Sequence, residues 1–158
     1  MKAAVMYGPN DIRIEEVAKP VCPDGGFLLK VSAVGLCGSD IRNLTTDSRN
    51  GDYPHIYGHE IVGVVDEVSP DCKEYKKGER LYIYPGDHCM QCESCRTGHS
   101  EMCENGGDYI NRQGGFADYV PVTKTQVRRD SIYRIPDGVK MERASLGEPL
   151  SSVYACQE

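Results

Sequence analysis

Residues 89–103 read Cys89-Met-Gln-Cys92-Glu-Ser-Cys95-Arg-Thr-Gly-His-Ser-Glu-Met-Cys103, which places four thiols within fifteen residues. Zinc prefers four ligands in a tetrahedron, and thiolates suit this borderline-soft ion. Two residues between successive cysteines let their thiolates turn toward one point, and a seven-residue return brings the fourth thiolate back. Because four protein ligands leave no open position, the pattern predicts a structural zinc lobe over residues 86–107 rather than a catalytic zinc.

Two other interpretations of these cysteines remain open. The chain has eight cysteines, an even number, and disulfides would require an oxidising compartment. The first nine residues, however, contain no long apolar segment of the kind found in secretory signals. An iron–sulfur cluster would resemble the ferredoxin run, in which the last gap is three residues and proline follows, whereas Glu104 follows here. We therefore favour zinc.

Length and charge limit the classes of function. A chain of 158 residues can form one domain with its own core. The net charge of -6 and the pI of about 5.2 suggest neither a nucleic-acid partner nor an anionic membrane. No apolar stretch approaches the length that spans a bilayer, so we expect a protein of the reducing cytoplasm.

Most of the chain is predicted to form short β-strands separated by turn signals. Gly63, inside one of the apolar segments, indicates a bulge or a close backbone approach. The pattern favours a mainly β fold, an all-β barrel or a partly open one. The expected strands are 2–7, 12–17, 27–36, 61–68, 80–84, 116–122 and 132–135.

Helices are expected in only two regions. A short helix could follow Ser39, which would act as its N-cap. The second region is the tail from Met141 onward, where Pro149 fits the first turn of a further helix that begins at about Glu148.

A second group of chemically capable residues lies at predicted strand ends. Cys37 follows one strand, and His59 and Glu60 directly precede another. Each alone is more often structural, but a catalytic zinc needs about three protein ligands and one open position, which Cys37, His59 and a carboxylate would supply. Asp40 could accept the other N–H of a zinc-bound His59, or it could cap the short helix.

Taken in order along the chain, these segments resemble the N-terminal catalytic domain of the zinc-dependent medium-chain dehydrogenase/reductases, the alcohol and polyol dehydrogenase superfamily. The resemblance covers nearly the whole chain, and an ordered set of motifs is more specific than any one of them. The motifs are Gly35-Leu-Cys37-Gly-Ser39-Asp40, Gly58-His59-Glu60, Tyr75-Lys-Lys-Gly78-Glu-Arg80-Leu, the four-cysteine run, Gly114-Gly115-Phe116-Ala-Asp-Tyr119-Val, Ile135-Pro136-Asp137-Gly138-Val139 and Glu148-Pro149-Leu150.

The resemblance implies a GroES-like, partly open β-barrel over residues 1–158, with short helices and the four-cysteine lobe. It implies a structural zinc on Cys89, Cys92, Cys95 and Cys103, and a catalytic zinc on Cys37 and His59. The third ligand of the catalytic zinc stays open between Glu60 and Glu148. Cys156 is a weaker competitor, and a buried thiol is the better expectation for it.

The resemblance also implies the chemistry. Zinc would polarise a substrate hydroxyl, and hydride would pass to NAD or NADP. Ser39 matches the hydroxyl residue that passes the alcohol proton toward solvent. Some relatives continue this relay with a histidine where this chain has Arg42, so the relay must differ and could pass through water or His55, which is otherwise expected to be an exposed loop residue. Tyr57 could line the pocket or simply pack.

The substrate is indicated only in outline. Glu148 together with Ser39 favours a polyol, whereas Arg42 could favour an acidic or phosphorylated substrate. No Gly-x-Gly-x-x-Gly turn is present, and the glycines at 106–107 and 114–115 lack its spacing. We therefore expect a catalytic-domain fragment that is inactive and monomeric by itself, from an enzyme that forms homodimers or homotetramers.

Two alternatives differ from this interpretation in kind. A non-catalytic, zinc-stabilised binding module would hold one zinc in the four-cysteine lobe, whereas the dehydrogenase domain would hold two. A GroES-like chaperonin subunit would leave the cysteine lobe and the Gly-His-Glu turn without a purpose.

Overall fold

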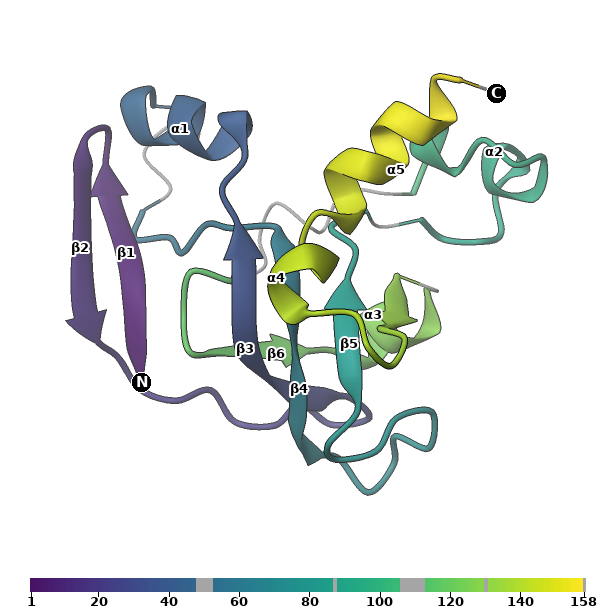
Figure 1. Cartoon of the computed structure of the whole chain (residues 1–158), viewed down its shortest axis with the longest axis horizontal. Helices are drawn as coiled ribbons and strands as arrows, with labels where there is room; N and C mark the ends of the chain where they lie inside the picture. The colour runs from purple at the N-terminus through teal and green to yellow at the C-terminus, as the bar shows by residue number, and fades with distance from the viewer. Residues whose placement is uncertain (48–52, 87, 106–112, 130, 158) are drawn as a thin grey trace.

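The fold is mainly β, with two antiparallel sheets (Figure 1). It is given by a computed structural model that describes residues 1–47, 53–86, 88–105, 113–129 and 131–157. A hairpin of β1 (Lys2–Gly8) and β2 (Asp11–Glu16) stands beside a five-stranded sheet in the order β6-β3-β4-β5-β7. The strands of that sheet are β3 (Phe27–Gly35), β4 (Glu60–Val68), β5 (Arg80–Ile83), β6 (Tyr119–Val122) and β7 (Ile132–Arg134).

All seven predicted strands are present, and the largest difference in their bounds is at β6, which begins at Tyr119 rather than at Phe116. Isolated bridges from Ala3 to Ala117 and from Met6 to His55 connect the hairpin to the rest of the fold. Among the described residues the two sheets do not close into a complete barrel, which agrees with the partly open form expected.

Gly63 allows β3 and β4 to approach closely. A Cβ atom at this position would lie 2.3 Å from the carbonyl oxygen of Lys30 and 2.7 Å from Cγ of Leu29. The register of β3 against β4 also shifts between Val31 and Ala33, next to Gly63. Both features that the glycine predicted, a bulge and a close approach, are therefore confirmed.

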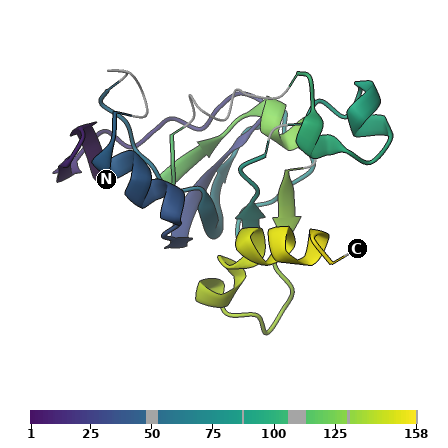
Figure 2. The same cartoon turned by 90° about the horizontal axis from the view of Figure 1, so that it is seen from above.

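The five-stranded sheet buries side chains on both faces. One face carries the larger core, in which Phe27, Leu29, Val65 and Leu81 are almost completely buried. The other face carries a smaller cluster of Val62, Tyr82 and Ile135, against which Met141 and Ala144 of α4 (Met141–Ala144) pack. Figure 2 shows α4 and α5 (Gly147–Ala155) together on one side of the sheet.

The short helices include the two regions that were expected, but one predicted cap is wrong. Helix α1 (Gly38–Thr45) has Cys37, not Ser39, as its N-cap, because Asp40 Oδ2 accepts the Cys37 N–H at 2.9 Å. The expected tail helices are α4 and α5. The remaining helices are α2 (Glu93–Arg96), the 3-10 helix η1 (Ser100–Met102) and α3 (Lys124–Arg128).

Helix α3 was not predicted, although its sequence carries a start signal. Thr123 and Gln126 form a capping box: the Thr123 N–H donates to the Gln126 side chain at 2.9 Å, and the Gln126 N–H donates to the Thr123 hydroxyl at 3.4 Å. Among the described helices, none is long and apolar enough to cross a membrane.

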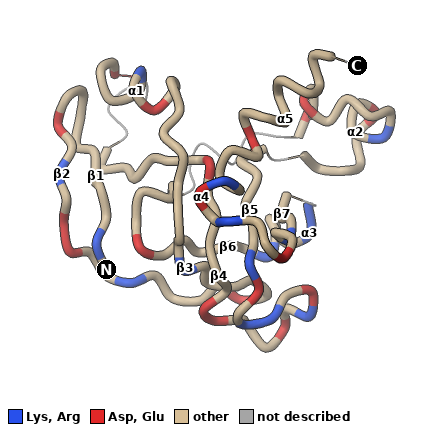
Figure 3. Tube along the Cα trace, in the orientation of Figure 1, with Lys and Arg blue, Asp and Glu red and all other residues tan. Residues whose placement is uncertain are grey.

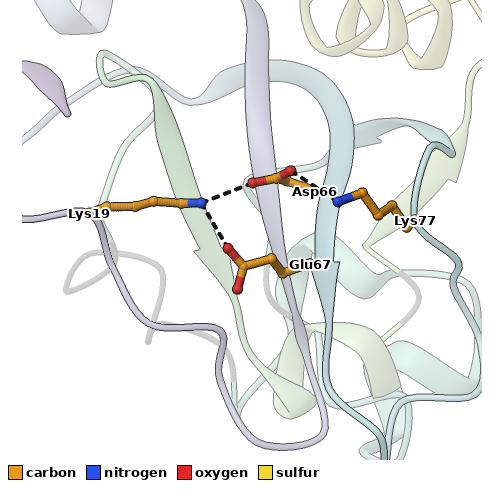
Figure 4. A network of polar contacts seen from close by, with 4 residues as sticks. All are labelled: Lys19, Asp66, Glu67 and Lys77. Carbon is orange, nitrogen blue, oxygen red and sulfur yellow. Dashed lines mark hydrogen bonds and ion pairs between the residues drawn. The ribbon is translucent and has the colours of Figure 1, made fainter.

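An ionic network ties the segment after β2 to the sheet (Figure 4). Lys19 Nζ lies 2.9 Å from Asp66 and 2.8 Å from Glu67 on β4, and it also lies 4.3 Å from the centre of the Tyr119 ring. Lys77 Nζ approaches Asp66 from the other side at 3.6 Å. Figure 3 shows acidic and basic positions mixed along this end of β4 and the turn that follows.

Candidate metal centres

The four-cysteine run forms one compact cluster at the edge of the fold. The sulfur atoms of Cys89, Cys92, Cys95 and Cys103 lie within 4.8 Å of one another. All eight cysteines of the chain are free thiols. The Cys92 and Cys103 sulfurs are 3.9 Å apart, about twice the length of a disulfide bond, so the arrangement suits a shared metal ion and not a disulfide.

Backbone N–H groups point at this sulfur cluster. The Cys92 N–H donates to Cys89 Sγ at 3.2 Å, and the Cys89 N–H donates to Cys103 Sγ at 3.2 Å. The N–H groups of Cys92 and Gln91 lower the pKa of Cys89 to about 6, whereas desolvation raises the pKa of Cys95 to about 12. Cys89 is therefore prepared to act as a thiolate, and Cys95 needs a cation to release its proton.

A second cluster forms at the end of the sheet where β3 finishes and β4 begins. Ligand atoms of Cys37, His59 and Glu60 lie within 4.8 Å of one another. The antiparallel register sets Gly35 opposite Glu60, and Cys37 follows two residues later at the start of α1. The strand pairing thus brings together residues that are more than twenty positions apart in the sequence.

Asp40 lies beside both of the groups that the sequence offered it as partners, the start of α1 and His59. Its side chain is 1% exposed, and besides capping α1 its Oδ1 atom lies 3.5 Å from His59 Nδ1. Asp40 is the main cause that raises the pKa of His59 to about 9. With Nδ1 turned toward a carboxylate, Nε2 is the His59 nitrogen that can bind a metal.

The carboxylate of Glu60 fits against Gly35 and is buried. Glu60 is 5% exposed, and burial raises the pKa of its carboxyl group. A Cβ atom at Gly35 would lie 1.6 Å from Glu60 Oε2, so no side chain can replace this glycine without displacing the carboxylate. The sequence motif contains Gly35, but its function as space for Glu60 becomes visible only in the structure.

The Cys37 thiol lies at the start of α1 beside Ser39. The side chain and the N–H of Ser39 are the two largest causes that lower the pKa of Cys37, and His59 acts in the same direction. These neighbours favour the thiolate form of Cys37, which is the form that binds metals.

Glu148 lies near the cluster without joining it. It is in the first turn of α5 and half-buried, and its charge contributes to the raised pKa of Glu60. Cys156, in contrast, is exposed just after the end of α5, so the expectation of a buried thiol is wrong. Since the described residues contain a three-ligand group with Glu60 and none with Glu148, the geometry places Glu60 closer to the other two ligands.

The sequence also indicated roles near the site for His55, Tyr57 and Arg42. His55 is not the exposed loop residue that was expected: it is half-buried and exchanges two backbone hydrogen bonds with Met6. Its ring meets that of Tyr57 edge-on at 4.8 Å. The Tyr57 hydroxyl is buried without a hydrogen-bond partner among the described residues, and Arg42 is exposed on α1.

Comparison with known proteins agrees with this geometry. Residues 23–137 match the family model of the alcohol dehydrogenase GroES-like domain. The sorbitol dehydrogenase of Bacillus subtilis is 36% identical over 157 residues, which cover 96% of this chain and 43% of that protein.

Solved structures of dehydrogenases are also similar to this chain. Galactitol-1-phosphate dehydrogenase of Escherichia coli is similar with a TM-score of 0.80 and 29% identity, over 96% of this chain and 42% of that one. An alcohol dehydrogenase of Escherichia coli CFT073, complexed with NADH, is similar with a TM-score of 0.78 and 29% identity, over 96% and 43%. The chain therefore spans less than half the length of these relatives.

Proposed function

Since the chain belongs to the alcohol dehydrogenase GroES-like domain family, we propose that it is the catalytic domain of a zinc-dependent alcohol or polyol dehydrogenase. The observation that carries this proposal is the convergence of Cys37, His59 and Glu60 on one point, with Asp40 behind His59. A thiolate, an imidazole and a carboxylate form a donor set that zinc accepts while one position stays open.

The two clusters would have different functions. Cys89, Cys92, Cys95 and Cys103 would hold a structural zinc in a lobe that we assign to residues 86–107, although residues 87 and 106–107 lie outside the described part of the chain. Cys37, His59 and Glu60 would hold the catalytic zinc, with Glu148, whose charge acts on Glu60, as the alternative carboxylate ligand. We assign the whole chain, residues 1–158, to the catalytic domain.

The residues around the second cluster would have different roles in alcohol oxidation. When bound, zinc would lower the pKa of a substrate hydroxyl so that hydride can leave the carbon. Asp40 would keep His59 in the orientation and tautomer that present Nε2. Ser39, whose side chain lowers the pKa of Cys37, would accept the alcohol proton and pass it toward solvent. Arg42 stands where some relatives continue this relay with a histidine, so the later steps of the relay would differ here.

The class of substrate follows from the relatives and from the site. Relatives named for sorbitol and galactitol 1-phosphate support a small polyhydroxylated substrate, and NAD or NADP would accept the hydride. Exposed Arg42, at the α1 end of the site, would suit an acidic or phosphorylated substrate. We further propose a cytoplasmic enzyme that assembles as a homodimer or homotetramer.

Cobalt substitution tests the catalytic centre. Cobalt bound at the Cys37 site should give visible absorption bands that change when sorbitol is added, because the open position takes a substrate hydroxyl. Cys37→Ser should abolish the sorbitol-sensitive bands and keep those of the four-cysteine lobe. The proposal would be overturned if sorbitol does not change the cobalt bands of wild-type protein and if Cys37→Ser shows the same bands as wild type.

A further inference from the structure

Tyr82 places a polar group where only an apolar one would be expected. It lies on β5 in the buried cluster with Val62 and Ile135, and it is 8% exposed. Its hydroxyl is buried and has no hydrogen-bond partner among the described residues. A buried hydroxyl without a partner costs free energy, so a phenylalanine would serve packing better unless the hydroxyl has a function.

The sheet register brings Tyr82 toward the catalytic-type cluster. Tyr82 pairs with Val62 across β4 and β5, and Glu60 lies two residues before Val62 on the same face. Tyr82 and Glu60 are therefore diagonal neighbours, a separation that long side chains can bridge. On the other side, a Cβ atom at Gly147 would lie 3.5 Å from the Tyr82 ring, which puts the ring against the residue that precedes Glu148.

Electrostatics agree with this placement. Burial is the main cause of the raised pKa of Tyr82, followed by the negative charges of Glu148 and Glu60. The backbone N–H of Glu148 acts on this pKa in the opposite direction and lowers it, but an N–H cannot accept the phenol proton. A carboxylate can accept it, and the carboxylates whose charges act on the pKa of Tyr82 include those of Glu148 and Glu60.

We propose that Tyr82 is a positioning residue of the metal centre: with metal bound, its otherwise unpartnered hydroxyl donates a hydrogen bond to the Glu148 carboxylate and holds that carboxylate beside Glu60. This inference rests on the proposed function. Tyr82 would touch neither metal nor substrate, and it would act only through Glu148. Partners of this kind commonly change metal affinity by about 10- to 100-fold.

The test measures Co²⁺ affinity at the Cys37-dependent site by visible absorption, in the whole chain. Tyr82→Phe should weaken binding about tenfold and leave the four-cysteine lobe unchanged. Tyr133→Phe is the matched control, because Tyr133 pairs with Tyr82 on the neighbouring strand but is 49% exposed, and it should have no effect. In a Glu148→Gln background, Tyr82→Phe should add little further loss.

The outcomes separate this inference from the proposed function. If wild-type protein binds two Co²⁺ ions and Tyr82→Phe keeps full affinity with higher thermal stability, the hydroxyl is merely packed and the inference is overturned. A full tenfold loss in the Glu148→Gln background would also overturn it, because Tyr82 would not act through Glu148. Wild-type protein that binds one Co²⁺ ion, in the lobe alone, would contradict the proposed function and this inference together.

Discussion

At the scale of single residues, Gly35 supplies the space that the Glu60 carboxylate fills. We predict that Gly35→Ala weakens zinc binding at the Cys37 site by about tenfold or more, because the added methyl group would meet Glu60 Oε2. Zinc titration with a chromophoric chelator measures the change. Gly38→Ala is the control, since a Cβ atom there meets nothing within 4 Å. Equal affinity in the two variants would show that the position of Glu60 does not matter.

Asp40 sets the protonation of His59. In metal-free protein, Asp40→Asn should lower the His59 pKa from about 9 toward its ordinary value near 6.5, as followed by NMR of the imidazole protons. Asparagine keeps an oxygen for the Cys37 N–H, so the cap of α1 should survive. Glu101→Gln, which removes an exposed carboxylate 3.5 Å from His99, should leave the His59 titration unchanged.

The raised pKa of His59 also predicts how the stability of the metal-free protein depends on pH. Because the folded state raises the His59 pKa, the Asp40–His59 contact stabilises metal-free protein fully below about pH 6.5 and loses this effect as pH rises through about 9. The stability deficit of Asp40→Asn should therefore be largest in acid and shrink above pH 9. A deficit that grows with pH would contradict this account.

The sequence identified some of these residues and could not identify others. The proximity of Cys37 and His59 was predictable because both residues stand in distinctive motifs at strand ends. The choice between Glu60 and Glu148 depends on how α5 packs against the sheet, which no local pattern reports. Tyr82 gave no signal, because an aromatic residue in a strand is ordinary until its buried hydroxyl proves to be unpaired.

At the scale of elements, the contact between β3 and β4 depends on Gly63. We expect Gly63→Ala to lower the free energy of unfolding by about 1–3 kcal/mol, since its Cβ would clash with the backbone of Lys30. Urea unfolding measures this loss. Gly8→Ala, where a Cβ meets nothing within 4 Å, should cost much less. Similar losses in the two variants would argue against a tight β3–β4 approach.

The Lys19 network should respond to acid. Lys19 is the main cause that lowers the pKa of Asp66, so the contact stabilises the protein above the unfolded pKa of about 3.9 and is lost as pH falls through the lower folded value. Lys19→Gln should lower the unfolding temperature at pH 7 by only about 2 °C, because the network is exposed. The difference from wild type should shrink as the pH falls below about 3.9.

Lys77→Gln is the matched change for that prediction. The Lys77 side chain is 74% exposed and its Nζ lies 3.6 Å from Asp66, so the loss should be smaller than for Lys19→Gln. A larger loss for Lys77→Gln would show that the Tyr119 and Glu67 contacts of Lys19 contribute nothing.

Strands were easier to predict than helices at this scale. Short apolar segments between turn signals marked all seven strands. Helix α3 has only five residues, too few for a helical period, and its capping box was the one available signal. The N-cap of α1 was misplaced by two positions, because the capping contact uses the Asp40 carboxylate and the Cys37 N–H instead of the Ser39 hydroxyl.

At the scale of the whole molecule, the two candidate metal centres are built by different secondary-structure elements. The catalytic-type cluster forms where β3 ends and β4 begins, and helices α1 and α5 both lie beyond that end of the sheet (Figure 1). The four-cysteine lobe is closed by its own short helices, α2 and η1. Each site should therefore bind or lose its zinc ion independently of the other site.

Zinc content per polypeptide tests this account most directly, with wild-type protein beside Cys37→Ser and Cys103→Ser. The account predicts about two zinc ions in wild type and about one in each variant, with the sheet intact by circular dichroism. One zinc ion in wild type that Cys37→Ser does not change would contradict a separate catalytic centre and leave a zinc-stabilised module.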